Sequence, residues 1–157
     1  MSEPRKVVFD CNVFLQALAN PDGPAGRCVT LALEAKVALF VSPQVLEEIR
    51  EVTSRPMLVR KFRLRLDRVQ LLLDNLRKAA VVVPHVREEW TYARDPDDAH
   101  YVNLALATGA MLVISRDKDL LDLMNDANPE GKLLRAQHPT FAVLTPPQFL
   151  SETPPEP

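Results

Sequence analysis

The segment Lys6-Val7-Val8-Phe9-Asp10-Cys11-Asn12-Val13-Phe14-Leu15 decides the fold. A short apolar run rich in β-branched residues ends in a carboxylate, and an apolar, helix-like segment follows, which predicts a buried strand leading into a helix. Ligands bind at the carboxyl ends of the strands in open α/β sheets, so we expect Asp10 at the mouth of the sheet. Taken alone, Asp10 or Asn12 is better explained as a cap of the next helix. Two later stretches that also place acids beside apolar runs weaken that explanation.

Further short apolar runs alternate with helix-like segments along the rest of the chain. The predicted strands after the first are residues 37–41, 80–84, 111–115 and 141–144, and the predicted helices are residues 13–19, 25–35, 44–54, 60–75, 96–108 and 120–124. This alternation predicts an α/β fold, a three-layer α/β/α domain with a mostly parallel five-stranded sheet and right-handed crossovers. We expect a loop at residues 125–139, a domain spanning residues 1–150, and a disordered Pro- and Glu-rich tail at residues 151–157.

Composition limits the classes of function. The 157 residues, 46% of them hydrophobic, suit one domain with a real core. The net charge of −2 gives no overall attraction to nucleic acid, so binding to nucleic acid requires a local basic patch or a bound cation. No run approaches the roughly 18 apolar residues of a membrane span, and no signal-peptide segment precedes the first strand. We therefore expect a cytoplasmic protein with no membrane partner, in which Cys11 and Cys28 are reduced and buried.

Three more acids lie beside apolar segments. Ser42-Pro43 predicts a helix start, and on that helix Glu48 lies roughly 60° from the centre of the apolar face, given about 100° per residue. The alternative for Glu48 is a helix-edge side chain that reaches into water. Asp97 and Asp98 both suit the positive end of the helix predicted to start at Asp95-Pro96, and geometry does not choose between them.

The fourth predicted strand repeats the Asp10 pattern, because Arg116-Asp117-Lys118-Asp119 follows its apolar run. If the first and fourth strands are neighbours, Asp10 and Asp117 emerge side by side, and the other acids can reach the same place. Four carboxylates repel one another unless a cation neutralises them, and Mg²⁺ or Mn²⁺ binds through such oxygen ligands. A cation of this kind activates water and stabilises the leaving oxygen in phosphodiester hydrolysis. The absence of His or Cys ligands fits phosphate chemistry better than a zinc site.

A basic segment at residues 60–68 contains Arg60, Lys61, Arg63 and Arg65. It is predicted to form the first half of the long amphipathic helix at residues 60–75. A solvated charged face and a phosphate-contacting patch explain it equally well.

Four stretches together resemble the motifs of PIN-domain ribonucleases, close to the VapC-type toxin components of bacterial toxin–antitoxin pairs. These stretches are Val7–Val13, Ser42–Ile49, Asp95–Ala99 and Val113–Leu121. In the second block of the family the acid directly precedes an aliphatic residue, and in the third it precedes a small residue. The resemblance therefore selects Glu48 and Asp98. Cys11 and Ser115 stand where Thr is usual, and neither change removes a metal ligand.

The resemblance covers Lys6 to about Leu150. It implies a PIN-like fold and a Mg²⁺- or Mn²⁺-dependent endoribonuclease that acts on single-stranded RNA. The implied catalytic metal ligands are Asp10, Glu48, Asp98 and Asp117, with Asp119 as an accessory ligand and with Asn12 and Ser115 positioning ligands or phosphate. It also implies a toxin, a homodimer and a small antitoxin that masks the acidic pocket.

Two other classes of function compete with this interpretation. The first is a non-catalytic PIN-like module that binds RNA or protein. Degenerate modules commonly lose some of the acids, whereas all four are present here. The second is an aspartyl-phosphate phosphatase on a similar sheet, which would place a second Asp two residues after Asp10, where this chain has Asn12.

Overall fold

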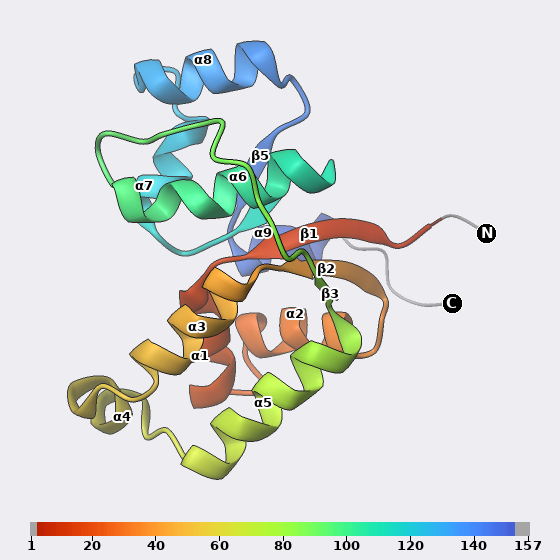
Figure 1. Cartoon of the computed structure of the whole chain (residues 1–157), viewed down its shortest axis with the longest axis vertical. Coiled ribbons are helices and arrows are strands. Elements are labelled where there is room, and N and C mark those ends of the chain that lie inside the picture. Colours follow the sequence, from red (N-terminus) through yellow and green to blue (C-terminus); the bar gives the residue numbers. More distant parts are fainter. Residues whose placement is uncertain (1–2, 153–157) are drawn as a thin grey trace.

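The computed structural model describes residues 3–152 and shows a parallel sheet covered by helices on both faces (Figure 1). The strands are β1 (Arg5–Phe9), β2 (Val37–Val41), β3 (Val81–Val82), β4 (Leu112–Ile114) and β5 (Ala142–Leu144). In the described part of the chain they form one five-stranded sheet in the order β3-β2-β1-β4-β5, with every neighbouring pair parallel. The predicted α/β class and parallel five-stranded sheet are confirmed.

The helices alternate with the strands, as predicted for a parallel sheet. Their bounds are α1 (Cys11–Ala19), α2 (Pro24–Leu33), α3 (Pro43–Val52), α4 (Pro56–Phe62), α5 (Leu66–Ala79), α6 (Ala99–Thr108), α7 (Lys118–Leu121), α8 (Pro129–Gln137) and α9 (Pro146–Glu152), with 3₁₀ turns η1 (Pro96–Asp98) and η2 (Asp122–Met124). Figure 1 shows α1, α2, α3 and α5 on one side of the sheet and α6 and α8 on the other. No helix within residues 3–152 is long and apolar enough to cross a membrane.

The second half of the central strand β1, Val7–Phe9, is buried on both faces of the sheet, which is why it is a continuous apolar run rather than an alternating one. It pairs with β4 in the register Val8 to Val113 and Phe9 to Ile114. The pairing continues past the strand, because the Asp10 N–H donates to the Ile114 carbonyl at 3.1 Å. Consequently the residues that leave β1 and β4 lie next to each other at the carboxyl edge of the sheet.

The prediction of one long basic helix at residues 60–75 is wrong. Helix α4 ends at Phe62, and Arg63 adopts a left-handed conformation with φ of 52°. The Leu64 N–H donates to the Val59 carbonyl at 2.9 Å, which closes the helix end in a Schellman-type turn. Such turns usually carry Gly, so the sequence offers no visible stop signal here. Helix α5 starts three residues later, at Leu66.

The predicted loop at residues 125–139 is also wrong, because α8 lies within it. The Asn128 side chain accepts the N–H groups of Glu130 and Gly131 at 3.1 and 3.2 Å, and Pro129 occupies the first helical position. The predicted tail also starts too early: Ser151 and Glu152 form the end of α9. The rest of that tail, residues 153–157, lies outside the described residues.

Candidate metal centre

The four acids predicted to form a site line one hollow of about 120 Å³. Asp10 leaves β1, Asp117 follows β4, Asp98 ends η1, and Glu48 lies on α3. The other lining residues are Cys11, Asn12, Val52 and Tyr101. The site therefore draws on both central strands and on a helix from each side of the sheet.

Asp10 is a helix cap and also faces the hollow. Its Oδ1 accepts the Val13 N–H at 3.2 Å, and its Oδ2 accepts the Ser115 hydroxyl. The Ser115 oxygen in turn accepts the Asp117 N–H at 2.8 Å, so one buried hydroxyl connects the two acids. Burial raises the pKa of Asp10 to about 6, although the hydrogen bond from Ser115 opposes the shift. The capping role and the site role are thus compatible in one side chain.

The Asp98 carboxyl is costly to ionise in the folded protein. Burial, followed by the charges of Asp117 and Asp95, raises its pKa to about 8. Its Oδ2 is buried and has no hydrogen-bond partner among the described residues. Asp97, by contrast, is exposed. The structure thus distinguishes two acids that helical geometry leaves equivalent.

A buried, unpaired carboxylate oxygen beside other acids is expected either to carry a proton or to face a cation. The acids near Asp98 offer carboxylate oxygens as metal ligands, which suit a hard divalent cation such as Mg²⁺ or Mn²⁺. The residues present therefore fit the metal that the resemblance implies.

The tightest acidic group differs from the predicted four. Carboxylate oxygens of Asp95, Asp98 and Asp119 lie within 4.8 Å of one another. Asp98 belongs to both sets, and Asp119 was predicted only as an accessory ligand. Asp119 is also paired with Arg94, whose Nε lies 2.8 Å from its Oδ1. Asp95, interpreted from sequence as a helix cap, does cap η1 by accepting the Asp97 N–H at 3.2 Å.

Glu48 is held by two residues that the sequence reasoning missed. Its Oε1 accepts the Tyr101 hydroxyl, and its Oε2 lies 3.4 Å from His100 Nε2. The Tyr101 oxygen also accepts the Cys11 N–H at 3.0 Å, which connects α3 and α6 to the start of α1. Burial alone would raise the pKa of Glu48, but the hydrogen bonds from His100 and Tyr101 bring it below its ordinary value. The available signal was a pair of polar aromatic residues directly after Asp98-Ala99 in an otherwise apolar helix.

The remaining predicted residues lie at the rim of the hollow or beyond it. Asn12 is exposed and lines the hollow, while Ser115 is fully buried beneath it. The four predicted RNA-binding residues are exposed but do not line it: Arg60 and Lys61 lie in the last turn of α4, and Arg63 and Arg65 lie between α4 and α5. Both cysteines are buried and unpaired, as predicted.

Comparison with known proteins agrees with this arrangement. The profile of the PIN domain matches residues 6–119, a range that contains the whole hollow. An uncharacterized protein of Methanocaldococcus jannaschii is 33% identical over 147 residues, which cover 94% of this chain and 90% of that protein. PIN domains are in general nucleases that use divalent metal ions, in keeping with the acidic cluster described above. The chain belongs to the PIN domain family.

Proposed function

We propose that this protein is a Mg²⁺- or Mn²⁺-dependent endoribonuclease that hydrolyses phosphodiester bonds of single-stranded RNA. The observation that carries the proposal concerns Asp98, which lines a hollow with three other acids and whose buried Oδ2 has no hydrogen-bond partner among the described residues. A PIN-domain chain that keeps all four acids around one hollow, one of them with a buried carboxylate oxygen that no described donor satisfies, is equipped for a cation. In a non-catalytic module nothing would compensate for the cost of burying these acids together.

The cation would be held by Asp98, Asp10, Asp117 and Glu48. Asp119 would assist, and Asp95 lies near Asp98 and Asp119. When bound, a divalent cation supplies an activated water and stabilises negative charge on the departing oxygen of a phosphodiester. The protein supplies the positioning: Ser115 fixes Asp10 relative to Asp117, and His100 with Tyr101 orients Glu48. In this proposal the amide of Asn12, which is exposed and lines the hollow, donates to a phosphate oxygen.

The exposed basic residues Arg60, Lys61, Arg63 and Arg65 support an RNA substrate, because phosphate contacts supply most of the non-specific affinity for nucleic acids. These residues form a local concentration of positive charge in a protein whose net charge is −2. Arg65 also pairs with Asp67 at 3.0 Å, so its charge is partly offset. Arg60, Lys61 and Arg63 therefore contribute most of the local positive charge in this proposal.

The same region supports a protein partner. Met57 on α4 and Leu66 and Leu71 on α5 are 72, 84 and 59% exposed, which is unusual for large apolar side chains on neighbouring helices. We assign these apolar residues to a homodimer contact or to a small antitoxin of a type II toxin–antitoxin system. The expected behaviour is growth arrest on expression of the wild-type chain and none on expression of Asp10→Asn. Equal growth of the two strains, at equal protein levels, would remove the toxin role.

The nuclease itself is tested by cleavage of a mixed-sequence single-stranded RNA with Mn²⁺, with EDTA, and with Asp10→Asn. We expect cleavage by the wild type in Mn²⁺ alone. The asparagine keeps the cap on α1, because its amide oxygen can accept the Val13 N–H, so the fold should persist. Full activity of Asp10→Asn in excess metal would overturn the assignment. A silent wild type that binds no cation would favour the non-catalytic module.

A further inference from the structure

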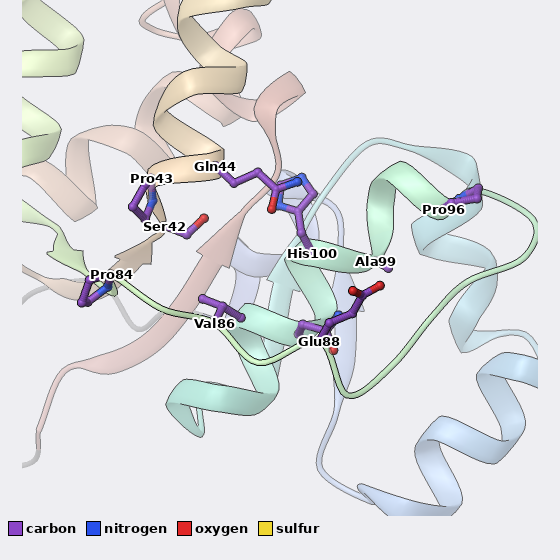
Figure 2. Close-up of a pocket in the computed structure, with 10 residues that line it drawn as sticks. Ser42, Pro43, Gln44, Pro84, Val86, Glu88, Pro96, Ala99 and His100 are labelled. Carbon is purple, nitrogen blue, oxygen red and sulfur yellow. The ribbon is translucent and has the colours of Figure 1, made fainter.

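The structure has a second and larger cavity, of about 420 Å³, whose lining residues are drawn in Figure 2. One wall is the start of α3, with Gln44, and another is the first half of α6, with His100 and Asn103. The third wall is the chain that follows β3, where Pro84, Val86 and Glu88 line the cavity. These three residues alternate along the chain, as the residues on one face of an extended segment do.

This third wall is held in place by a buried residue. Asn103 is 2% exposed, and its Oδ1 accepts the N–H groups of Glu89 and Trp90 at 3.2 and 2.9 Å. Its Nδ2 donates to the Trp90 carbonyl at 2.9 Å. All three of these hydrogen bonds join the Asn103 side chain to the segment that carries Glu88. The cavity is therefore preformed, because its outer wall is fixed to α6 from the inside.

The cavity and the acidic hollow share a wall. His100 lines the cavity, and its Nε2 faces Glu48, which lines the hollow. Ala99 also lines the cavity and directly follows Asp98. The cavity therefore adjoins the acids, on the side where the base of a nucleotide bound there by its phosphate can lie.

Several polar groups of the residues that line the cavity have no hydrogen-bond partner among the described residues. Within residues 3–152, the side chains of Gln44 and Glu88 have no hydrogen-bond partner, and His100 Nδ1 is buried without one. Figure 2 shows the Gln44 side chain extending toward the His100 ring, with Glu88 carried by the wall that follows β3. Pro84 and Val86 offer apolar surface to the face of a ring. This combination of apolar walls and a few polar groups is typical of small-ligand sites.

We propose that this cavity binds an unpaired nucleobase next to the scissile phosphate and selects bases that carry an exocyclic amino group. This inference rests on the proposed nuclease function. The Glu88 carboxylate repels phosphate but accepts a hydrogen bond from an amino group, such as N4 of cytosine. Uracil presents the O4 acceptor at the same position, so Glu88 disfavours it. Single-stranded RNA is read in this way, through the edges of splayed bases.

The test compares an all-uridine RNA with the same RNA carrying one central cytidine. Binding is read by fluorescence anisotropy in Ca²⁺, and cleavage positions are mapped in Mn²⁺. We expect about tenfold tighter binding of the cytidine RNA and cleavage at the linkages that flank cytidine. In Glu88→Gln, the amide can donate to O4 of uracil, so the binding ratio should fall to about one. Glu89→Gln removes the same charge from the neighbouring residue, which does not line the cavity, and should keep the ratio.

The outcomes separate this inference from the nuclease assignment. Cleavage of both RNAs with no preference for cytidine, or a preference that survives in Glu88→Gln, overturns the base pocket and leaves the nuclease intact. A binding preference that Glu88→Gln abolishes, in a protein that cleaves neither RNA, supports the pocket and overturns the nuclease. Absence of both binding and cleavage overturns the two proposals together.

Discussion

Replacing Asp98 with asparagine should stabilise the metal-free protein while it removes metal binding. Ionising Asp98 in the folded protein is costly because the carboxylate is partly buried beside Asp117, Asp95 and Asp10, which raises its pKa to about 8 from 3.8. An asparagine carries no charge, and its amide N–H groups can donate to the neighbouring carboxylates. At neutral pH the wild type must either ionise this carboxyl beside other acids or keep on it a proton that the unfolded chain releases, and the variant removes this cost.

The magnitude follows from linkage between protonation and folding. The folded pKa lies above the unfolded value, so the folded state binds more protons, and the free energy of unfolding falls as the pH rises from 3.8 toward 8. At pH 7.5 the ceiling is about 5 kcal/mol, since each pKa unit is worth about 1.4 kcal/mol. Asp98 is only partly buried, and its neighbours share the proton, so we expect a gain of about 2 kcal/mol for Asp98→Asn.

The assay is urea unfolding in EDTA at pH 5.5 and 7.5, with Asp97→Asn as the matched control. Asp97 is adjacent in sequence but exposed, so its replacement should change the free energy of unfolding little. The gain of Asp98→Asn over the wild type should shrink at pH 5.5, because keeping a proton on the folded-state carboxyl costs less as the pH approaches the unfolded pKa of 3.8. Addition of Mn²⁺ should reverse the order, because only the wild type gains binding free energy. Equal or lower stability of Asp98→Asn at pH 7.5 in EDTA would refute this reasoning.

Three further predictions concern the surroundings of the acids. Ser115→Ala should lower the free energy of unfolding by about 1–2 kcal/mol in urea titrations and weaken Mn²⁺ binding, because Asp10 and the Asp117 N–H lose their shared partner. Ser115→Thr keeps the hydroxyl and should keep both the stability and the Mn²⁺ affinity. Cation binding at pH 7 should release about one proton, mainly from Asp98. Calorimetry in buffers of different ionisation enthalpy should show that this release vanishes near pH 9. A release that does not change with pH would contradict the raised pKa of Asp98. Joint replacement of Arg60, Lys61 and Arg63 by alanine should weaken RNA binding and flatten its salt dependence, whereas an unchanged salt slope would assign these residues to another role.

The sheet and the acids that follow its strands were predictable because they depend on short-range patterns. The run Val7-Val8-Phe9 reads as a fully buried strand, and Asp10 follows it directly in the structure. The Ser42-Pro43 start of α3 was visible for the same reason, since Ser42 caps the helix by accepting the Val45 N–H at 3.1 Å. Parallel pairing then brings residues from distant parts of the chain to one edge.

What sequence reasoning missed depends on contacts between elements. The helix break at Arg63 contains no Gly or Pro, so the helical pattern of the sequence continues through it. Asn128-Pro129 is a recognisable helix start, but the polar segment that follows has only two residues, Gly131 and Leu134, fully buried in its helix. The hydrogen bond from the Tyr101 hydroxyl to Glu48 could not be predicted from the sequence, because it depends on how α6 packs relative to α3.

The most direct test of the metal centre is a Mn²⁺ titration followed by electron paramagnetic resonance, with the wild type, Asp98→Asn and Asp97→Asn compared at pH 7.5. If the bare Asp98 oxygen faces a cation, the wild type and Asp97→Asn bind Mn²⁺ alike, and Asp98→Asn loses at least tenfold in affinity, about 1.4 kcal/mol. Binding of Mn²⁺ by Asp98→Asn with the affinity of the wild type would contradict the assignment of this hollow as a metal centre.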